Sequence, residues 1–251
     1  MIARQRGGAW NVRFSPEELA RWKRFLQAFG RRVKMRKSGW WQRAPKGKLW
    51  EVFVGEFLVR GGTRLVDRAW ENGEKWRQFL RQTSLAASLT TSEAQLAGVL
   101  NGKTRFPKVQ AKAIKKCLFN PEVVRNNRFV LLDGLELLHS DEERREEICR
   151  RCPTLRLKGA SNLLINVGAA KHLAAIDTRV VGCLERHFRF SHSASGVQSS
   201  RALYTALEST LREVARRNGM TLSQLDRAVF RASGTTVLDF FMGGKPAYRG
   251  F

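Results

Sequence analysis

Lys158 and Asp177 are the residues whose types and spacing most suggest covalent chemistry. Lys158 stands near the expected start of a helix, in Leu157–Ser161, and Asp177 follows Ala175-Ile176 where the next helix should begin. A lysine amine is a nucleophile, and a carboxylate stabilises positive charge that develops on a carbon under attack. Such a pair suits cleavage of a glycosidic bond at a sugar carbon.

The same two residues also have ordinary interpretations. Asp177 occupies an N-cap position, which aspartate often fills without any further role. Lys158 alone would pass for a surface lysine. A helix N-terminus is nevertheless an unusual place for a cation, and the positive end of the dipole favours the neutral amine that attacks. The charge of Asp177 acts in the opposite direction, so the sequence leaves the balance open.

The charge of the chain indicates a polyanionic partner. The sequence has 46 Lys and Arg against 22 Asp and Glu, a formal net charge of +24. Residues 1–50 hold 14 of these cations and only the acids Glu17 and Glu18, which is half of the net charge. A domain this basic is typical of nucleic-acid binding. A solvated basic surface is the alternative.

Cations and aromatic residues are mixed within the N-terminal fifth, a pattern that favours phosphate neutralisation with stacking on bases or sugars. Packing of the two tryptophans in the core is the alternative. The candidate DNA contacts in this stretch are Arg32, Lys34, Arg36, Lys37, Trp40 and Trp41.

Composition excludes several classes of protein. No apolar run reaches membrane-spanning length, and the basic N-terminus lacks the apolar region of an export signal. We therefore expect a cytoplasmic, nucleoid-associated monomer with reduced thiols. Cys149 and Cys152 form a lone C-x-x-C without a second pair, so ordinary thiols and no metal or other cofactor are expected.

Helical periodicity runs through most of the chain. Ser15 is expected to cap a helix that continues to Phe29, with Gly30 as its C-cap. Further helices are expected over 49–58, 108–118, 141–151, 178–188, 201–218 and 221–232, and from Thr91 or Ser92 and from Lys158 onward. Ser191–Ser200 is the candidate linker or mobile loop. No strand alternation is evident, so we predict an all-α fold, with a basic N-terminal helix and connector over 1–48 and a helical domain over 49–251.

The region around the pair resembles the active-site segment of the helix-hairpin-helix DNA glycosylase superfamily, most closely the lysine-bearing 8-oxoguanine DNA glycosylases of archaeal and bacterial type. The family pattern Lys-x-Ala-Ser-x-x-Leu-x-Asn-x-Gly is matched by Lys158, Ala160, Ser161, Leu164, Asn166 and Gly168. The following Ile-Asp and hydrophobic helix are matched by Ile176, Asp177, Val180 and Val181. Weaker similarity extends over roughly residues 49–232, including Thr104–Pro107 and Leu222–Phe230.

The resemblance implies two helical lobes with the active-site cleft between them. It implies a duplex DNA substrate whose modified base is flipped out and removed by Lys158 and Asp177, with strand cleavage at the resulting site as a further activity. The base that it favours is 8-oxoguanine. Arg105 would contact DNA, and Phe240 and Phe241 would line the base pocket; a terminal tail with both rings in the core is the alternative.

The hairpin before Lys158 departs from the family pattern. The family presents glycines there, so that backbone N–H groups approach a phosphate, whereas Cys152–Leu157 contains none. We infer that Arg156 supplies the phosphate contact electrostatically.

Two alternatives remain open. The altered hairpin and long basic N-terminus also suit a glycosylase that removes a hypermodified base of bacteriophage DNA, as an antiviral defence. A non-catalytic DNA-binding protein is the other, in which the helices 201–217 and 221–232 form a helix-turn-helix with Arg227 and Arg231 facing DNA.

Overall fold

The computed structural model describes residues 1–6, 9–30, 33, 35–60 and 62–232. These residues form two compact units: unit 1 consists of the described residues of 1–35 and 170–232, and unit 2 of those of 36–169. Helices dominate both described parts, which confirms the all-α prediction. The division expected after residue 48 stays a prediction.

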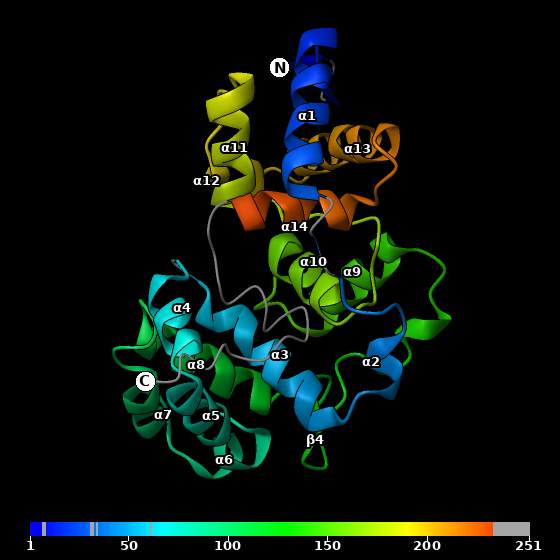
Figure 1. Cartoon of the computed structure of the whole chain (residues 1–251). Helices are drawn as coiled ribbons and strands as arrows, with labels where there is room; N and C mark the ends of the chain where they lie inside the picture. The colour runs from blue at the N-terminus through cyan, green and yellow to red at the C-terminus, as the bar shows by residue number, and fades with distance from the viewer. Residues whose placement is uncertain (7–8, 31–32, 34, 61, 233–251) are drawn as a thin grey trace. The chain divides into compact units, whose positions relative to one another are not determined.

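Unit 1 is built from one hairpin and five helices in its described residues. The helices pack largely around α14, which contacts α1, α11 and α13, while α13 also contacts α12 and β2 (Figure 1). Its core includes Trp22, whose ring stacks on Phe188 with 4.6 Å between centroids. The elements are β1 (Ile2–Arg6), β2 (Ala9–Arg13), α1 (Pro16–Phe29), α11 (Thr178–Phe188), α12 (Ala194–Ser199), α13 (Arg201–Arg217) and α14 (Leu222–Ala232).

Unit 2 is organised around α3 (Lys46–Leu58), which contacts α6, α8, α10 and β4. Nearly every residue of α3 from Leu49 onward is buried, as expected for a helix that is apolar on all sides. The other elements of this unit are α2 (Trp40–Arg43), α4 (Arg64–Glu71), α5 (Gly73–Gln82), α6 (Leu85–Thr90), α7 (Glu93–Leu100), α8 (Pro107–Leu118), β3 (Val124–Arg125), β4 (Arg128–Phe129), the 3-10 helix η2 (Leu135–Leu137), α9 (Asp141–Arg151) and α10 (Leu157–Asn166).

Local capping explains why several predicted helix ends were correct. Ser15 accepts a hydrogen bond from the Glu18 N–H, and the Glu18 side chain accepts one from the Ser15 N–H, which completes a capping box at α1. Gly30 is the C-cap of this helix, as predicted. Ser92 forms a second capping box with Gln95 at the start of α7.

The structure corrects two local predictions. Strands are present, since β1 pairs antiparallel with β2 and β3 with β4. The second hairpin turns through Asn126 and Asn127, both with positive φ, and asparagine tolerates that conformation better than most residues. The supposed linker contains α12, which Ser193 caps through the Gly196 N–H.

The described residues include no helix that is long and apolar enough to cross a membrane.

Candidate active site

The turn between α9 and α10 positions Lys158. Ser140 caps α9, and Pro153 follows its C-cap Cys152. The chain then turns through a hydrogen bond from the Leu155 N–H to the Cys152 carbonyl, 2.8 Å long, and none of these residues has a positive φ. The turn therefore forms without the left-handed backbone that glycine supplies, which explains how Cys152–Leu157 can lack it.

A second contact on this turn comes from Arg60, two residues beyond the end of α3. The Arg60 guanidinium donates to the Thr154 carbonyl at 2.6 Å and lies over the Phe57 ring, 4.5 Å from its centroid. Burial lowers the pKa of Arg60 from its ordinary value. A tightly held donor on the turn fixes the direction in which α10 begins.

Lys158 is the second residue of α10 and is half-buried. The N-cap residue Arg156 makes no side-chain cap hydrogen bond, so the first N–H groups of α10 have no side-chain cap. Lys158 makes no hydrogen bond or ion pair within the described part of its unit. The amine and the uncapped amides thus share one end of the helix.

A buried acid anchors α10 against α3. Glu56 is 2% exposed and accepts hydrogen bonds from the amides of Asn162 and Asn166, at 2.8 and 2.9 Å. The two asparagines lie one helical turn apart, so a single carboxylate fixes both the rotation and the height of α10. The isolated acid in the apolar run Val52–Leu58 was the sequence signal for this contact, and we missed it.

The far end of α10 meets the basic connector. Arg36 donates to the Asn166 carbonyl at 2.8 Å and lies over the Trp40 ring, 3.8 Å from its centroid. Gly168 has φ +71°, and a Cβ there would overlap the Lys37 carbonyl. The motif glycine is therefore required by both backbone conformation and space.

Asp177 caps α11, as predicted. Its Oδ1 accepts hydrogen bonds from the N–H groups of Arg179 and Val180, at 2.8 and 3.2 Å, and its Oδ2 lies 3.0 Å from Nη1 of Arg179. The residue is 6% exposed. The segment before it, Leu173–Ile176, is buried and held by side chains of α13 and α14 that the sequence analysis did not single out as functional.

Lys158 belongs to unit 2 and Asp177 to unit 1. Each is placed at the start of its own helix, as expected, and their convergence on one substrate is a prediction.

The predicted DNA contacts differ in exposure. Arg105, Arg156 and Lys37 are exposed, while Arg36 and Trp40 are half-buried and stacked on one another. Arg32, Lys34, Phe240 and Phe241 lie outside the described residues.

Trp41 lies in the core of unit 2, at 8% exposed, which is the alternative considered for it above. Its ring is not presented for stacking in this structure, so a DNA contact by Trp41 stays a prediction. Phe106, which belongs to the Thr104–Pro107 resemblance but was not among the predicted DNA contacts, is 46% exposed and lies under the Arg105 guanidinium, 5.3 Å from its ring centroid. An exposed aromatic beside a cation is the usual signal for stacking on bases.

The helix-turn-helix alternative is weakened by the position of Arg227. This residue is 1% exposed and pairs with the buried Asp226 at 3.2 Å, so it does not face solvent as that alternative requires. Only Arg231 of the two is exposed.

The thiols are free, and two of them are neighbours. The sulfur atoms of Cys117 and Cys152 lie 3.7 Å apart, and both contact the Thr154 hydroxyl. The hydrogen bond with Cys117 lowers the pKa of Cys152 to about 7, and the same bond raises the pKa of Cys117. Among the described residues, no group of three or more potential ligands suits a metal ion.

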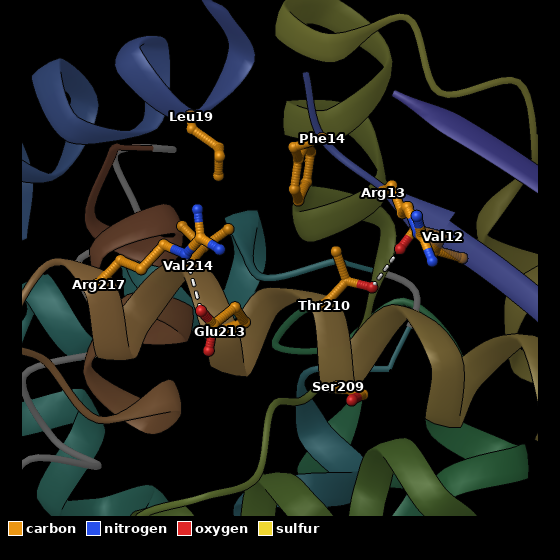
Figure 2. A pocket seen from close by; sticks show the side chains of 9 residues that line it. All are labelled: Val12, Arg13, Phe14, Leu19, Ser209, Thr210, Glu213, Val214 and Arg217. Atoms are coloured by element: carbon orange, nitrogen blue, oxygen red, sulfur yellow. Dashed lines mark hydrogen bonds and ion pairs between the residues drawn. The ribbon is translucent and has the colours of Figure 1, made fainter. Parts of the chain in front are cut away.

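An open pocket of about 400 Å³ lies in unit 1, lined by β2, α1 and α13 (Figure 2). Thr210 donates to the Val12 carbonyl at one side of it, and Arg217 pairs with Glu213 at the other. None of the predicted site residues lines this pocket.

Comparison with solved structures establishes the fold of the chain. The chain is similar to crystal structures of 8-oxoguanine DNA glycosylases at low sequence identity. For the Methanocaldococcus jannaschii enzyme the TM-score is 0.61 at 17% identity, covering 86% of this chain and 92% of that one. For the Thermotoga maritima enzyme the TM-score is 0.57 at 19% identity, covering 88% and 96%. These similarities establish a shared fold.

The same M. jannaschii glycosylase/lyase has been crystallised with a 15mer DNA containing 8-oxoguanine, and that structure matches with a TM-score of 0.59 at 17% identity, covering 88% of this chain and 91% of that one. No curated protein matches the chain. The sequence model of the Ogg-HhH family, 8-oxoguanine DNA glycosylase, matches residues 71–220, more than half of the chain. The chain belongs to this family.

Proposed function

We propose that the protein is a DNA glycosylase that flips a modified nucleotide out of duplex DNA and removes its base with Lys158 and Asp177, and that the base is 8-oxoguanine. The observation that carries the proposal is that the family match spans both residues, each of which lies at the N-terminal end of a helix. The relative crystallised with 8-oxoguanine DNA supports the choice of base.

The chemistry follows from the two groups. The Lys158 amine attacks C1′ of the flipped deoxyribose while the C1′–N9 bond breaks. The electron pair of the C1′–N9 bond leaves with the base, which takes up a proton. The carboxylate of Asp177 stabilises the positive charge that develops on the sugar. The sugar–lysine intermediate opens to a Schiff base as the C1′–O4′ bond breaks and O4′ takes up the proton that the amine loses. Loss of a C2′ proton then expels the 3′-phosphate with the C3′–O electron pair, which cleaves the strand.

DNA binding is supported by the net charge of the chain and by exposed side chains at two predicted contacts, Arg156 and Arg105. The net charge of +24 favours association with a polyanion. Arg156 is exposed beside the uncapped start of α10, where the helix dipole also favours a phosphate. Arg105 and Phe106 offer a cation and an aromatic ring together at the start of α8.

The test is base release from a panel of duplex oligonucleotides, each with one modified base, under enzyme excess. We expect free 8-oxoguanine from its duplex, at a rate at least tenfold above that for any other duplex of the panel. A mobility shift on every duplex without release of any base would contradict the proposal and favour a DNA-binding protein without enzymatic activity.

A further inference from the structure

The segment Leu173–Ile176 leads directly into Asp177 and is completely enclosed by protein. Its four residues are at most 1% exposed. The segment belongs to no helix or strand, so its backbone polar groups have no regular partners. Buried N–H and C=O groups must nevertheless be hydrogen-bonded, and side chains supply the bonds here.

Three consecutive N–H groups of this segment each donate to a different side chain. Ala174 donates to Glu208 Oε1 and Ala175 to Asp226 Oδ1, both at 3.0 Å. Ile176 donates to the Tyr204 hydroxyl at 3.2 Å. We call the set of Tyr204, Glu208 and Asp226 the polar cradle.

The Tyr204 hydroxyl closes the cradle, because it also donates to the Ala174 carbonyl at 2.7 Å. Two further side chains donate to the carbonyl groups of the first and last residues of the segment. Ser223 donates to the Leu173 carbonyl at 2.9 Å, and Gln198 donates to the Ile176 carbonyl at 3.0 Å. Both backbone polar groups of Ile176, the residue before Asp177, are thus fixed.

The cradle places two carboxylates in the protein interior, and each accepts a backbone hydrogen bond; Asp226 is also paired with Arg227 at 3.2 Å. Glu208 and Asp226 are 1% and 0% exposed, and burial of a carboxylate is unfavourable unless it is paired and hydrogen-bonded. A carboxylate that accepts a backbone N–H forms a charge-assisted bond, which is stronger and more directional than a neutral one. Two such bonds on adjacent residues hold the backbone firmly.

We infer that Tyr204, Glu208 and Asp226 are positioning residues. They hold the backbone before Asp177 and thereby keep the Asp177 carboxylate in one position during base excision. This inference rests on the proposed function. The cradle touches neither substrate nor the reacting atoms and acts through the segment 173–176. A displacement of about 1 Å in a catalytic group can lower a rate by about 100-fold, so loss of the cradle should slow base excision rather than DNA binding.

The test is Tyr204→Phe, which removes one hydroxyl and keeps the ring. Thr210→Val is the matched control, since the Thr210 hydroxyl also bonds backbone carbonyls from α13 but lies outside the cradle. We expect Tyr204→Phe to lower the single-turnover excision rate on an 8-oxoguanine duplex about 10- to 100-fold. Its Kd for that duplex should stay within about twofold of wild type, and Thr210→Val should change neither value. A wild-type rate for Tyr204→Phe, or equal losses in both variants, would overturn the inference.

A second pair of variants covers the case in which Tyr204→Phe does not fold, as judged by thermal unfolding. Glu208→Gln keeps an acceptor oxygen for the Ala174 N–H, whereas Glu208→Leu removes it. We expect the glutamine variant to keep the rate within about threefold of wild type and the leucine variant to lose about tenfold or more. Equal rates in the two variants would overturn the inference. Inactivity of the wild-type protein on every modified duplex would instead contradict the proposed function.

Discussion

Arg179 contacts the carboxylate of Asp177 twice. Its Nη1 lies 3.0 Å from Oδ2, and its backbone N–H donates to Oδ1 at 2.8 Å. The guanidinium also lies over the Phe230 ring, 4.9 Å from its centroid, which holds the arginine against α14. The orientation of the carboxylate is thus set by its own helix, by the adjacent side chain and by the segment that precedes it.

Substitutions of Asp177 should distinguish its role as a helix cap from the role of its negative charge in catalysis. Asparagine caps a helix about as well as aspartate, whereas alanine does not. We expect both Asp177→Asn and Asp177→Ala to lower the excision rate by about 100-fold or more, because both remove the stabilising charge. Only the alanine variant should also lose about 1 kcal/mol of stability in urea unfolding. An asparagine variant with the wild-type rate would show that the charge of Asp177 is not used.

Substitution of Gly168 tests the junction between α10 and the basic connector. Alanine at Gly168 places a Cβ against the Lys37 carbonyl in a backbone with φ +71°, so we expect a loss of about 1–3 kcal/mol in the free energy of unfolding. Gly98→Ala is the control in the same unit, since a Cβ at this helical position meets nothing within 4 Å. It should raise stability by about 0.5–1 kcal/mol. Equal effects of the two substitutions would contradict the packing described for Gly168.

The salt dependence of DNA binding tests the role of Arg156. If its guanidinium neutralises one phosphate, Arg156→Ala should reduce the slope of log K against log salt concentration by about 0.9. Arg216→Ala is the control, because Arg216 is exposed and already paired with Glu213 at 2.7 Å. The slope is measured by titrating the duplex at several salt concentrations between about 50 and 200 mM. An unchanged slope for Arg156→Ala would show that Arg156 does not neutralise a phosphate.

The acid stability of the protein should depend on Glu147. Hydrogen bonds from Arg150 and Arg151 lower the pKa of Glu147 to about 2 from the ordinary 4.5. A carboxyl with a lowered pKa contributes stability above its unfolded value and loses it as the pH falls through the folded value. The stability difference between wild type and Glu147→Gln should therefore be constant above about pH 5 and shrink towards pH 2.

Glu147 is half-buried but its partner Arg150 is exposed, so solvent screening should keep that difference below about 1 kcal/mol. Urea unfolding at a series of pH values measures it. A difference that grows on acidification would contradict the pairing with the two arginines.

Helices were predictable wherever caps and periodicity acted locally. The predicted spans 141–151 and 178–188 match α9 and α11 because local residues specify both helices. Ser140 caps α9, acids fill its first turn and Pro153 follows its end, whereas α11 combines the Asp177 cap with an apolar face. The hairpin β1–β2 and the short helix α12 were not predicted. Both are short elements, for which the periodic signal is weak.

The supporting residues of the site depend on partners far away in the sequence. Glu56 bonds to side chains 106 and 110 residues later, and Glu208 and Asp226 bond to a segment 34 and 51 residues earlier. Helical period indicates that such acids face inward, but it does not indicate the partner that satisfies them. Family resemblance directed attention to Lys158 and Asp177, and through Leu222–Phe230 to the helix that carries Asp226, whereas the partners of the three acids are visible only in the folded chain.

The most direct test of the account is covalent trapping with borohydride on an 8-oxoguanine duplex. A Schiff base between an amine and the sugar is reduced to a stable protein–DNA adduct, which denaturing gels separate from free DNA. We predict an adduct with the wild-type protein and with the control Lys171→Gln, and none with Lys158→Gln. An adduct of wild-type yield with Lys158→Gln would show that another amine attacks the sugar, and the assignment of Lys158 as the nucleophile would be wrong.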